Sequence, residues 1–326
     1  MKQIDMKRIA ATVIAFLFLT YAGRAAAAPL RISYAAIAAN IAGIWMAEGS
    51  GAFKKYGLDV QLIYIPSSGT NVQALLGGSI DVMVAGSSGI VSAAARGAPL
   101  VAIASQMNRP PVTLYVQPDI TKPDQLRNQV LGITRYGSST HALSALVLRK
   151  FGLEKSVTLR PLGETPAVQA AFEQKMIAGM LTTVKPRIAA RPLVNAADLD
   201  IPYPMSIIGV TQSFLQTNRE TLERLLRAYV EGVAMMVYDK ERAVNILAKY
   251  LRRSDPAFLD ETYTLVRTYT ERIPRFDARA IPVLLEFDPV KGVTADALEA
   301  RVIDNSIVDQ LAEEKFFEKF FGKELR

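Results

Sequence analysis

Short apolar segments with the character of strands alternate with helical segments from residue 30 onward. In the first run, strands are expected at residues 30–35, 59–65, 80–85 and 100–104. Helices are expected between them, because apolar residues recur there at helical spacing, beginning near Asn40 and continuing at 70–76 and 88–95. This alternation is typical of a parallel sheet with helices on both faces, so the sequence predicts an α/β fold.

A second run of the same kind follows. "NQVLGIT", "SVTLRPL" and "MIAGMLTT" have strand character, and helical stretches at 138–153 and 165–175 lie between them. The segments "ALLGGSIDVMVAG" and "AAFEQKMIAGMLTT" hold matching places in the two runs, each giving a short helix, a turn and a strand. The match is weak residue by residue, so chance similarity remains an alternative. The repeated order nevertheless favours two lobes of similar construction.

Two extended segments flanked by prolines separate these runs from their surroundings. Residues 112–116 lie between the runs, and 200–215 follow the second one, which predicts two crossings between the lobes. The sequence therefore predicts one lobe made of residues 28–113 and 209–326, and another made of 114–208.

The C-terminal third is expected to be helical. Beyond Asn218, three consecutive segments carry apolar stripes at helical spacing, and the last segment, 296–321, is amphipathic. Its phenylalanine pairs at 316/317 and 320/321 fit either a partner surface or a helix that packs on the core of the protein itself. The second interpretation is favoured.

The first 27 residues have the layout of a secretory signal peptide. Three basic residues precede an uncharged run at 9–23, and alanines at 25–28 follow it. A permanent membrane anchor is the alternative, but the run is shorter than the roughly 20 residues that a spanning helix needs. We expect cleavage after Ala27.

Composition restricts both the compartment and the chemistry. The chain has no cysteine, which excludes disulfides, thiolate metal sites and a cysteine for lipid attachment. Together with the export signal, this predicts a periplasmic protein that is not a lipoprotein. The leader carries +3 of the net charge of +7, and the other basic residues are scattered, so a nucleic-acid partner is not expected.

Small polar residues follow a strand in each run. Gly86, Ser87 and Ser88 come after the strand at 80–85, and residues 137–140 (Gly-Ser-Ser-Thr) come after the strand at 128–134. In open α/β sheets ligands bind at the carboxyl ends of the strands, where helix N-termini offer free N–H groups. Plain helix capping without a ligand is the alternative for either loop alone. Two such loops at matching places favour a binding cleft.

These motifs resemble the nitrate, taurine and aliphatic-sulfonate group of solute-binding proteins of ABC importers. The resemblance rests on the helix exit "FKKYGLDV" at 53–60, the turn "LGGSID" within 75–81, the small-residue tip at Gly86, and "DQLRNQVLGITRYGSSTHALSALVLRKFGL" at the start of the second lobe. It covers essentially the whole chain after the leader. It implies a type II periplasmic-binding-protein fold, with two α/β lobes joined by two crossover strands and a helical C-terminal part.

The resemblance also implies what the protein does. The two lobes would close around a small polar organic solute, such as a sulfonate or carboxylate, and deliver it to the transmembrane subunits of an ABC permease. A monomer without cofactor or metal is expected. By analogy with the family, the ligand contacts are Ala38, Asn40, Ser68, Gly69, Ser87, Ser88, Ser138, Ser139, Thr140, His141, Glu164 and Thr183.

The charge of the solute stays open at this stage. Arg135 is a candidate for a carboxylate or sulfonate, whereas Glu164 would oppose an anion and suit an amine or a hydroxyl-rich solute. Trp45, Tyr34, Tyr136 and Tyr203 are candidates for stacking on a flat ligand, although Trp45 on an apolar stripe is more often a core residue. "TTVK" at 182–185 departs from the usual serine and proline of the family, which weakens the assignment of Thr183.

Enzymatic alternatives are disfavoured. His141 is the only histidine, which excludes a histidine-rich metal site, and "GSSG" does not match the nucleophile elbow of hydrolases. Enzymes of thiamine-pyrimidine synthesis share the implied fold but depend on a cysteine-rich segment, and related cytoplasmic dehydratases of menaquinone synthesis lack an export signal. A periplasmic binding partner of a membrane sensor remains the alternative function.

Overall fold

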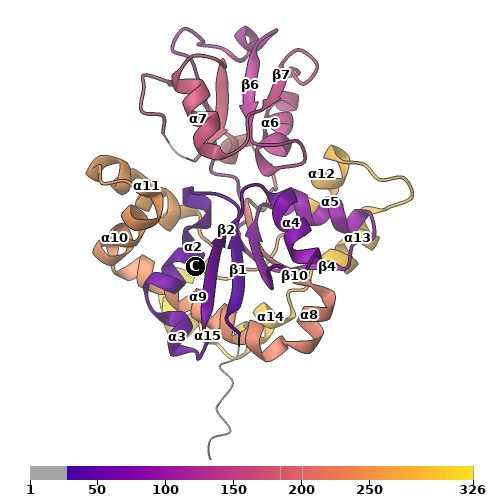
Figure 1. Cartoon of the computed structure of the whole chain (residues 1–326), viewed down its shortest axis with the longest axis vertical. Helices are drawn as coiled ribbons and strands as arrows, with labels where there is room; N and C mark the ends of the chain where they lie inside the picture. The colour runs from indigo at the N-terminus through magenta and orange to yellow at the C-terminus, as the bar shows by residue number, and fades with distance from the viewer. Residues whose placement is uncertain (1–27, 184, 200, 326) are drawn as a thin grey trace, which may run out of the picture.

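The computed structural model describes residues 28–183, 185–199 and 201–325. They form two α/β lobes, one above the other in Figure 1, with the C-terminal third of the chain packed around the larger lobe. The predicted signal peptide, residues 1–27, lies outside the described residues. No helix in the described ranges is both long enough and apolar enough to cross a membrane.

The larger lobe is built on a five-stranded sheet with the order β2-β1-β3-β10-β4. β1 pairs in parallel with β2 and with β3, whereas β10 runs antiparallel to both of its neighbours. The strands are β1 (Leu30–Tyr34), β2 (Val60–Tyr64), β3 (Val82–Ala85), β4 (Leu100–Met107) and β10 (Ser206–Thr211).

The smaller lobe repeats this arrangement. Its sheet has the order β7-β6-β8-β5-β9, in which β6, β7 and β8 are parallel and β5 is antiparallel to β8 and β9. The strands are β5 (Thr113–Val116), β6 (Val130–Ile133), β7 (Thr158–Pro161), β8 (Gly179–Thr182) and β9 (Arg191–Asn195). The two sheets therefore share one topology, which accounts for the repeated order seen in the sequence.

Helices follow most of the strands, as predicted. In the first run they are η1 (Ala39–Ile41), α2 (Ala42–Gly49), α3 (Ala52–Lys55), α4 (Ser68–Leu76) and α5 (Ser87–Ala95). In the smaller lobe they are η2 (Pro123–Leu126), α6 (Ser139–Lys150), α7 (Thr165–Glu173) and η3 (Ala196–Leu199). The motif "FKKYGLDV" ends α3 and turns into β2 at Gly57, whose φ of 70° is a left-handed conformation that glycine adopts without strain.

The C-terminal part is helical, and most of it packs on the larger lobe. α9 lies against α2, α13 against α5, and α14 against β4, while α12 also reaches α6 of the smaller lobe. The helices are α8 (Gln212–Thr217), α9 (Arg219–Tyr238), α10 (Lys240–Leu251), α11 (Pro256–Tyr269), α12 (Ala280–Phe287), α13 (Ala295–Val302), α14 (Ser306–Glu313), α15 (Phe316–Phe321) and η4 (Gly322–Leu325).

The sequence left two interpretations for the phenylalanine pairs of the last segment and for Trp45. In both cases the structure places the aromatic residues in the core. Phe316, Phe317 and Phe321 of α15 are buried, so this segment packs on the protein itself. Trp45 is fully buried and stacks on Tyr250 with ring centroids 5.0 Å apart. The apolar stripes of these helices therefore serve packing rather than recognition.

The chain passes between the lobes twice, first after β4 and then before β10. The two crossings run side by side, since Met205 N donates to Met107 O at 2.7 Å and Ala196 N donates to Val112 O at 2.8 Å. β10 joins the sheet of the larger lobe from Ser206, ahead of the boundary predicted at residue 209. The division into residues 28–113 with 209–326 and residues 114–208 otherwise stays a prediction.

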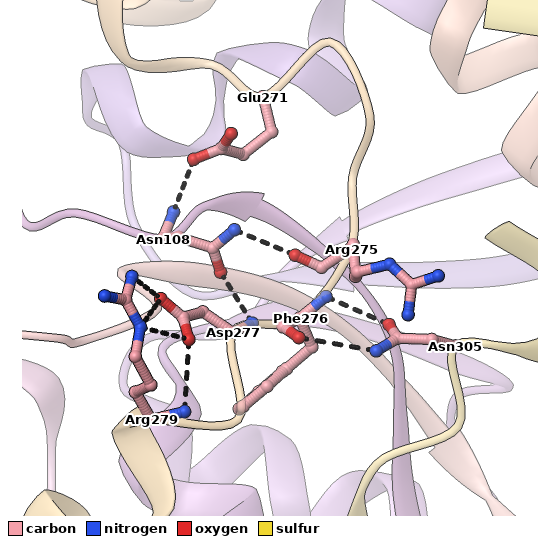
Figure 2. Close-up of polar contacts among 7 residues, drawn as sticks. All are labelled: Asn108, Glu271, Arg275, Phe276, Asp277, Arg279 and Asn305. Carbon is pink, nitrogen blue, oxygen red and sulfur yellow. Dashed lines mark hydrogen bonds and ion pairs between the residues drawn. The ribbon is translucent and has the colours of Figure 1, made fainter. Parts of the chain in front are cut away.

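A hydrogen-bond network fixes the start of the first crossing (Figure 2). Asn108 N donates to Glu271 Oε1 at 3.2 Å, and Asn108 Nδ2 donates to Arg275 O at 2.8 Å. Asp277 N donates to Asn108 Oδ1 at 3.1 Å. The segment after α11 is itself held by Asn305, which exchanges two hydrogen bonds with the backbone of Phe276. The crossing is thereby anchored to a loop nearly 170 residues away in the sequence.

Candidate functional site

A cavity of about 70 Å³ lies where the carboxyl ends of the parallel strands of the two sheets meet. A cavity of this size suits a small solute in this conformation. Its lining comes from both lobes and from both crossings: Ala35, Ala36, Ala38, Asn40, Pro66, Ser67, Ser68, Gly86, Val112, Thr134, Ser138, Ser139, Thr140, Leu143, Glu164, Thr165, Leu181, Thr182, Thr183 and Met205.

Hydrogen bonds connect the two lobes beside the cavity. Ser68 Oγ of α4 lies 3.2 Å from Ser139 Oγ of α6, at the N-termini of two facing helices. Ser88 Oγ donates to Gly137 O at 3.4 Å, so the two small-residue loops face one another as the sequence predicts. The structure therefore represents a form in which the lobes are closed.

Gly86 of the larger lobe lies directly against Ser139 of the smaller lobe. A Cβ atom built on it would lie 1.5 Å from Ser139 Oγ and 2.8 Å from Ser139 Cβ, so no larger residue fits in this closed form. The glycine is needed for space and not for its backbone conformation, since its φ of −68° and ψ of 150° are open to any residue. The residue after β3 therefore has no side chain because, in the closed form, Ser139 of the other lobe occupies that space.

The hydroxyls of the second loop hold the loop together. Ser138 caps α6 by accepting a hydrogen bond from His141 N, and its own hydroxyl donates to Arg135 O at 2.7 Å. Thr140 Oγ1 accepts from Thr134 N at 2.9 Å. These groups line the cavity with fixed geometry, so a ligand would meet a preorganised surface.

Other polar groups at the cavity do not take part in holding a loop together. Asn40 is buried, and its side-chain amide makes no hydrogen bond to any other described residue. Thr183 Oγ1 is buried without a partner. Ser67 has a φ of 74° and a ψ of 140°, a strained conformation for a residue with a side chain. Strain and unpaired polar groups cluster at functional sites, which supports this cavity as the candidate site.

Glu164 is the only charged side chain among the lining residues of the cavity in the described part of the chain. It comes after β7 as the N-cap of α7, is exposed at the cavity mouth, and accepts a hydrogen bond from Tyr64 OH of the larger lobe at 3.4 Å. Burial, reinforced by the Glu164 carboxylate, raises the pKa of Tyr64 to about 12. Tyr64 therefore remains a donor at any physiological pH.

Tyr203 and Ser87 lie behind the cavity, in the second crossing and at the start of α5. Tyr203 is fully buried, and burial raises its pKa while the hydroxyls of Ser139, Ser88 and Ser87 act in the opposite direction. The Ser87 and Tyr203 hydroxyls have no hydrogen-bond partner of good geometry among the described residues. They support the cavity from behind instead of lining it.

His141 has a structural environment. Its Nδ1 accepts a hydrogen bond from Gly137 N at 3.1 Å, and its ring packs edge-on between Tyr136 and Phe287. Burial lowers the pKa of His141, opposed by the nearby Asp288 carboxylate. Because Phe287 ends α12, the imidazole joins the smaller lobe to the C-terminal part and does not line the cavity.

The structure brings most of the predicted ligand residues together and leaves some apart. Eight line the cavity: Ala38, Asn40, Ser68, Ser138, Ser139, Thr140, Glu164 and Thr183. Four are absent from its lining: Gly69, Ser87, Ser88 and His141. Arg135 is exposed and also absent from it, as are Trp45, Tyr34, Tyr136 and Tyr203. Whether the eight lining residues contact a ligand remains a prediction.

Several lining residues that directly follow strands or lie in the crossings are not among the ligand contacts predicted from the sequence. Pro66 follows β2, Thr134 follows β6, and Val112 and Met205 lie in the two crossings. The rule that ligands bind at strand ends points to Pro66 and Thr134. No local pattern marks Val112 or Met205. In the described ranges, no group of three or more histidine, aspartate or glutamate side chains is placed to hold a metal ion.

A sequence model of the family described as NMT1/THI5 like matches residues 38–243, which include most of the cavity lining. The chain belongs to the NMT1/THI5-like family. This agrees with the resemblance found in the sequence. No curated protein matches the sequence.

Solved structures similar to this NMT1/THI5-like chain include periplasmic binding proteins. The aliphatic sulphonate binding protein SsuA from Escherichia coli is 21% identical with a TM-score of 0.64, covering 90% of this chain and 94% of that one. The alkanesulfonate-binding protein SsuA from Xanthomonas axonopodis pv. citri, bound to MOPS, is 19% identical with a TM-score of 0.67, covering 87% and 97%. The nitrate-binding protein NrtA from Synechocystis PCC 6803 is 13% identical with a TM-score of 0.69, covering 88% of each chain.

These similarities confirm the predicted fold class. The protein has the periplasmic-binding-protein fold, with two α/β lobes, two crossings and a helical C-terminal part. At such identities the similarity establishes the fold, and the ligand has to be argued from the cavity of this chain.

Proposed function

We propose that the protein is the extracytoplasmic solute-binding component of an ABC importer, which closes its lobes around a small polar organic solute. One observation carries the proposal: a cavity enclosed between two facing sets of strand ends, beside hydrogen bonds from one lobe to the other. Groups from both lobes would grip one solute, so binding would hold the lobes shut. The protein would be a binding protein and not an enzyme, like the three neighbours named above.

The remaining parts of the proposal follow from the sequence. The leader at 1–27 would direct the chain to the periplasm, where it would act as a monomer and pass the solute to the transmembrane subunits of the permease. The sulfonates and nitrate named for the similar structures define the first compounds to test. No cofactor is required for this role.

Ligand-induced stabilisation and closure together test the proposal. The chain from residue 28 is screened by thermal unfolding against sulfonates, nitrate, carboxylates, amines, amides and pyrimidines, because a ligand that binds only the folded state raises the unfolding temperature. Small-angle X-ray scattering then measures whether the best ligand reduces the radius of gyration. We expect both effects with one ligand class and no chemical change in the compound. Turnover of a compound, or no stabilisation by any class, would contradict the proposal.

A further inference from the structure

The electrostatics of the cavity point to the kind of solute. Its lining, as far as the described residues go, includes no lysine, arginine or histidine, and Glu164 supplies the only full charge. Arg135, the cation that the sequence places next to the second loop, is exposed and does not reach the cavity. A sulfonate, carboxylate or nitrate bound here would meet a carboxylate and no side-chain cation.

Glu164 is positioned for a ligand. One of its carboxylate oxygens receives the long hydrogen bond of 3.4 Å from Tyr64 OH across the lobes. The other oxygen has no hydrogen bond or ion pair with any described residue. Tyr64 thereby holds the carboxylate over the cavity mouth in the closed form and leaves acceptor capacity for the occupant. An N⁺–H donor would complete this site with a charge-assisted hydrogen bond.

Other groups of the cavity lining favour an acceptor. α4 and α6 both direct their N-termini at the cavity through Ser68 and Ser139, and these ends carry partial positive charge. The buried amide of Asn40 can donate or accept there. The cavity lining thus combines one carboxylate with hydroxyls, a side-chain amide and the N-termini of helices.

We propose that the solute carries a protonated nitrogen that binds Glu164, has a neutral or acceptor group at the helix N-termini, and bears no net negative charge. Amines, amidines and zwitterions satisfy this description, whereas free alkanesulfonates and nitrate do not. Glu164 is thus the residue that determines charge specificity. The inference rests on the proposed function, because it assigns the ligand class of the same cavity.

Two variants separate the charge of Glu164 from its contact between the lobes. Glu164→Gln removes the charge and keeps the shape, whereas Tyr64→Phe removes the hydrogen bond across the lobes and keeps the carboxylate. Binding is measured by calorimetry for pairs of probes that differ in charge and of which one carries an ammonium group: taurine against ethanesulfonate, and ethanolamine against glycolate. The best amine and the best anion of the thermal screen are measured alongside them.

We expect the unmodified protein to bind the ammonium-bearing probe of a pair more tightly. We expect Glu164→Gln to weaken that binding at least fivefold and to strengthen binding of anions, and Tyr64→Phe to change either by less than threefold. The inference is overturned if anions bind the unmodified protein best, if Glu164→Gln leaves amine affinity unchanged, or if both variants weaken it equally. In each of these cases the protein still closes on a solute, so the proposed function survives. Absence of binding by every class would instead overturn the proposed function, and this inference with it.

Discussion

Gly86 determines how closely the two lobes can approach. Alanine fits the backbone conformation of this residue, but its methyl group would overlap Ser139 of the other lobe. The conflict exists only when the lobes are closed, because Gly86 and Ser139 belong to different lobes. A substitution at Gly86 should therefore affect binding and spare the folding of the larger lobe.

We expect Gly86→Ala to weaken binding of the best solute at least tenfold while the ligand-free unfolding temperature changes little. The matched control is Gly69→Ala, since a Cβ at Gly69 has its nearest neighbour at 4.0 Å and the residue does not line the cavity. Titration calorimetry on both variants checks the prediction. Equal affinities for the two variants would mean that the lobes do not close as the structure shows them.

Single residues also mark the limit of what the sequence could predict. The small-residue tips were recognisable because glycine and serine after a strand have a physical use at a ligand site. His141 and Ser88, predicted as ligand contacts, do not line the cavity; their partners, Phe287 and Gly137, come from distant parts of the chain, so the sequence could not show this. The "ID" of the first-lobe motif proves structural, since Asp81 accepts two side-chain hydrogen bonds from Arg31 on β1.

The elements were largely predictable, with exceptions: α8 (Gln212–Thr217) is a helix that begins within the segment 200–215 expected to be extended, and the strand β9 was not predicted. Strands such as β3 and β4 are fully buried and apolar, so their sequences indicate them clearly. β9 was missed because it is an edge strand with exposed Arg191 and Pro192, and it has neither an apolar run nor clear alternation. β9 forms a strand because it pairs with β5 at the edge of the sheet, and not because its own residues favour a strand.

The segment after α11 holds the first crossing in place through hydrogen bonds with Asn108 (Figure 2). The Asn108 side chain binds Arg275 O and Asp277 N, and Asn305 binds the Phe276 backbone in a similar way from the other side. Both asparagines hold the same loop, but only Asn108 also belongs to the crossing.

We expect Asn108→Ala and Asn305→Ala each to reduce the free energy of unfolding by about 1–3 kcal/mol, because backbone groups lose their partners. Only Asn108→Ala should also change the affinity for the solute, since the crossing must bend when the lobes close. Urea unfolding and titration calorimetry measure the two effects. If Asn305→Ala altered affinity as much as Asn108→Ala, the network would have no specific link to the crossing.

At the scale of the whole molecule, the C-terminal helices take part in closure. Figure 1 shows α11 and α12 on opposite flanks of the molecule, next to the smaller lobe. Arg149 of α6 pairs with Glu286 of α12 at 2.6 Å, and Lys185 pairs with Glu261 of α11 at 3.6 Å. These ion pairs join residues far apart in the sequence, which is why the sequence predicted a helical C-terminal part but not its contacts with the smaller lobe.

The Arg149–Glu286 pair should favour the closed form by a small, salt-sensitive amount. Both side chains are exposed, so the contribution is at most about 1 kcal/mol and is screened by salt. We expect Glu286→Gln to weaken solute binding about two- to fivefold at low ionic strength, with the difference lost at high salt. Lys55→Gln is the control, because Lys55 pairs with Glu231 within the larger lobe at 2.6 Å and should leave affinity unchanged. A salt-independent loss in Glu286→Gln, or an equal loss in Lys55→Gln, would show that closure does not depend on this contact between the lobes.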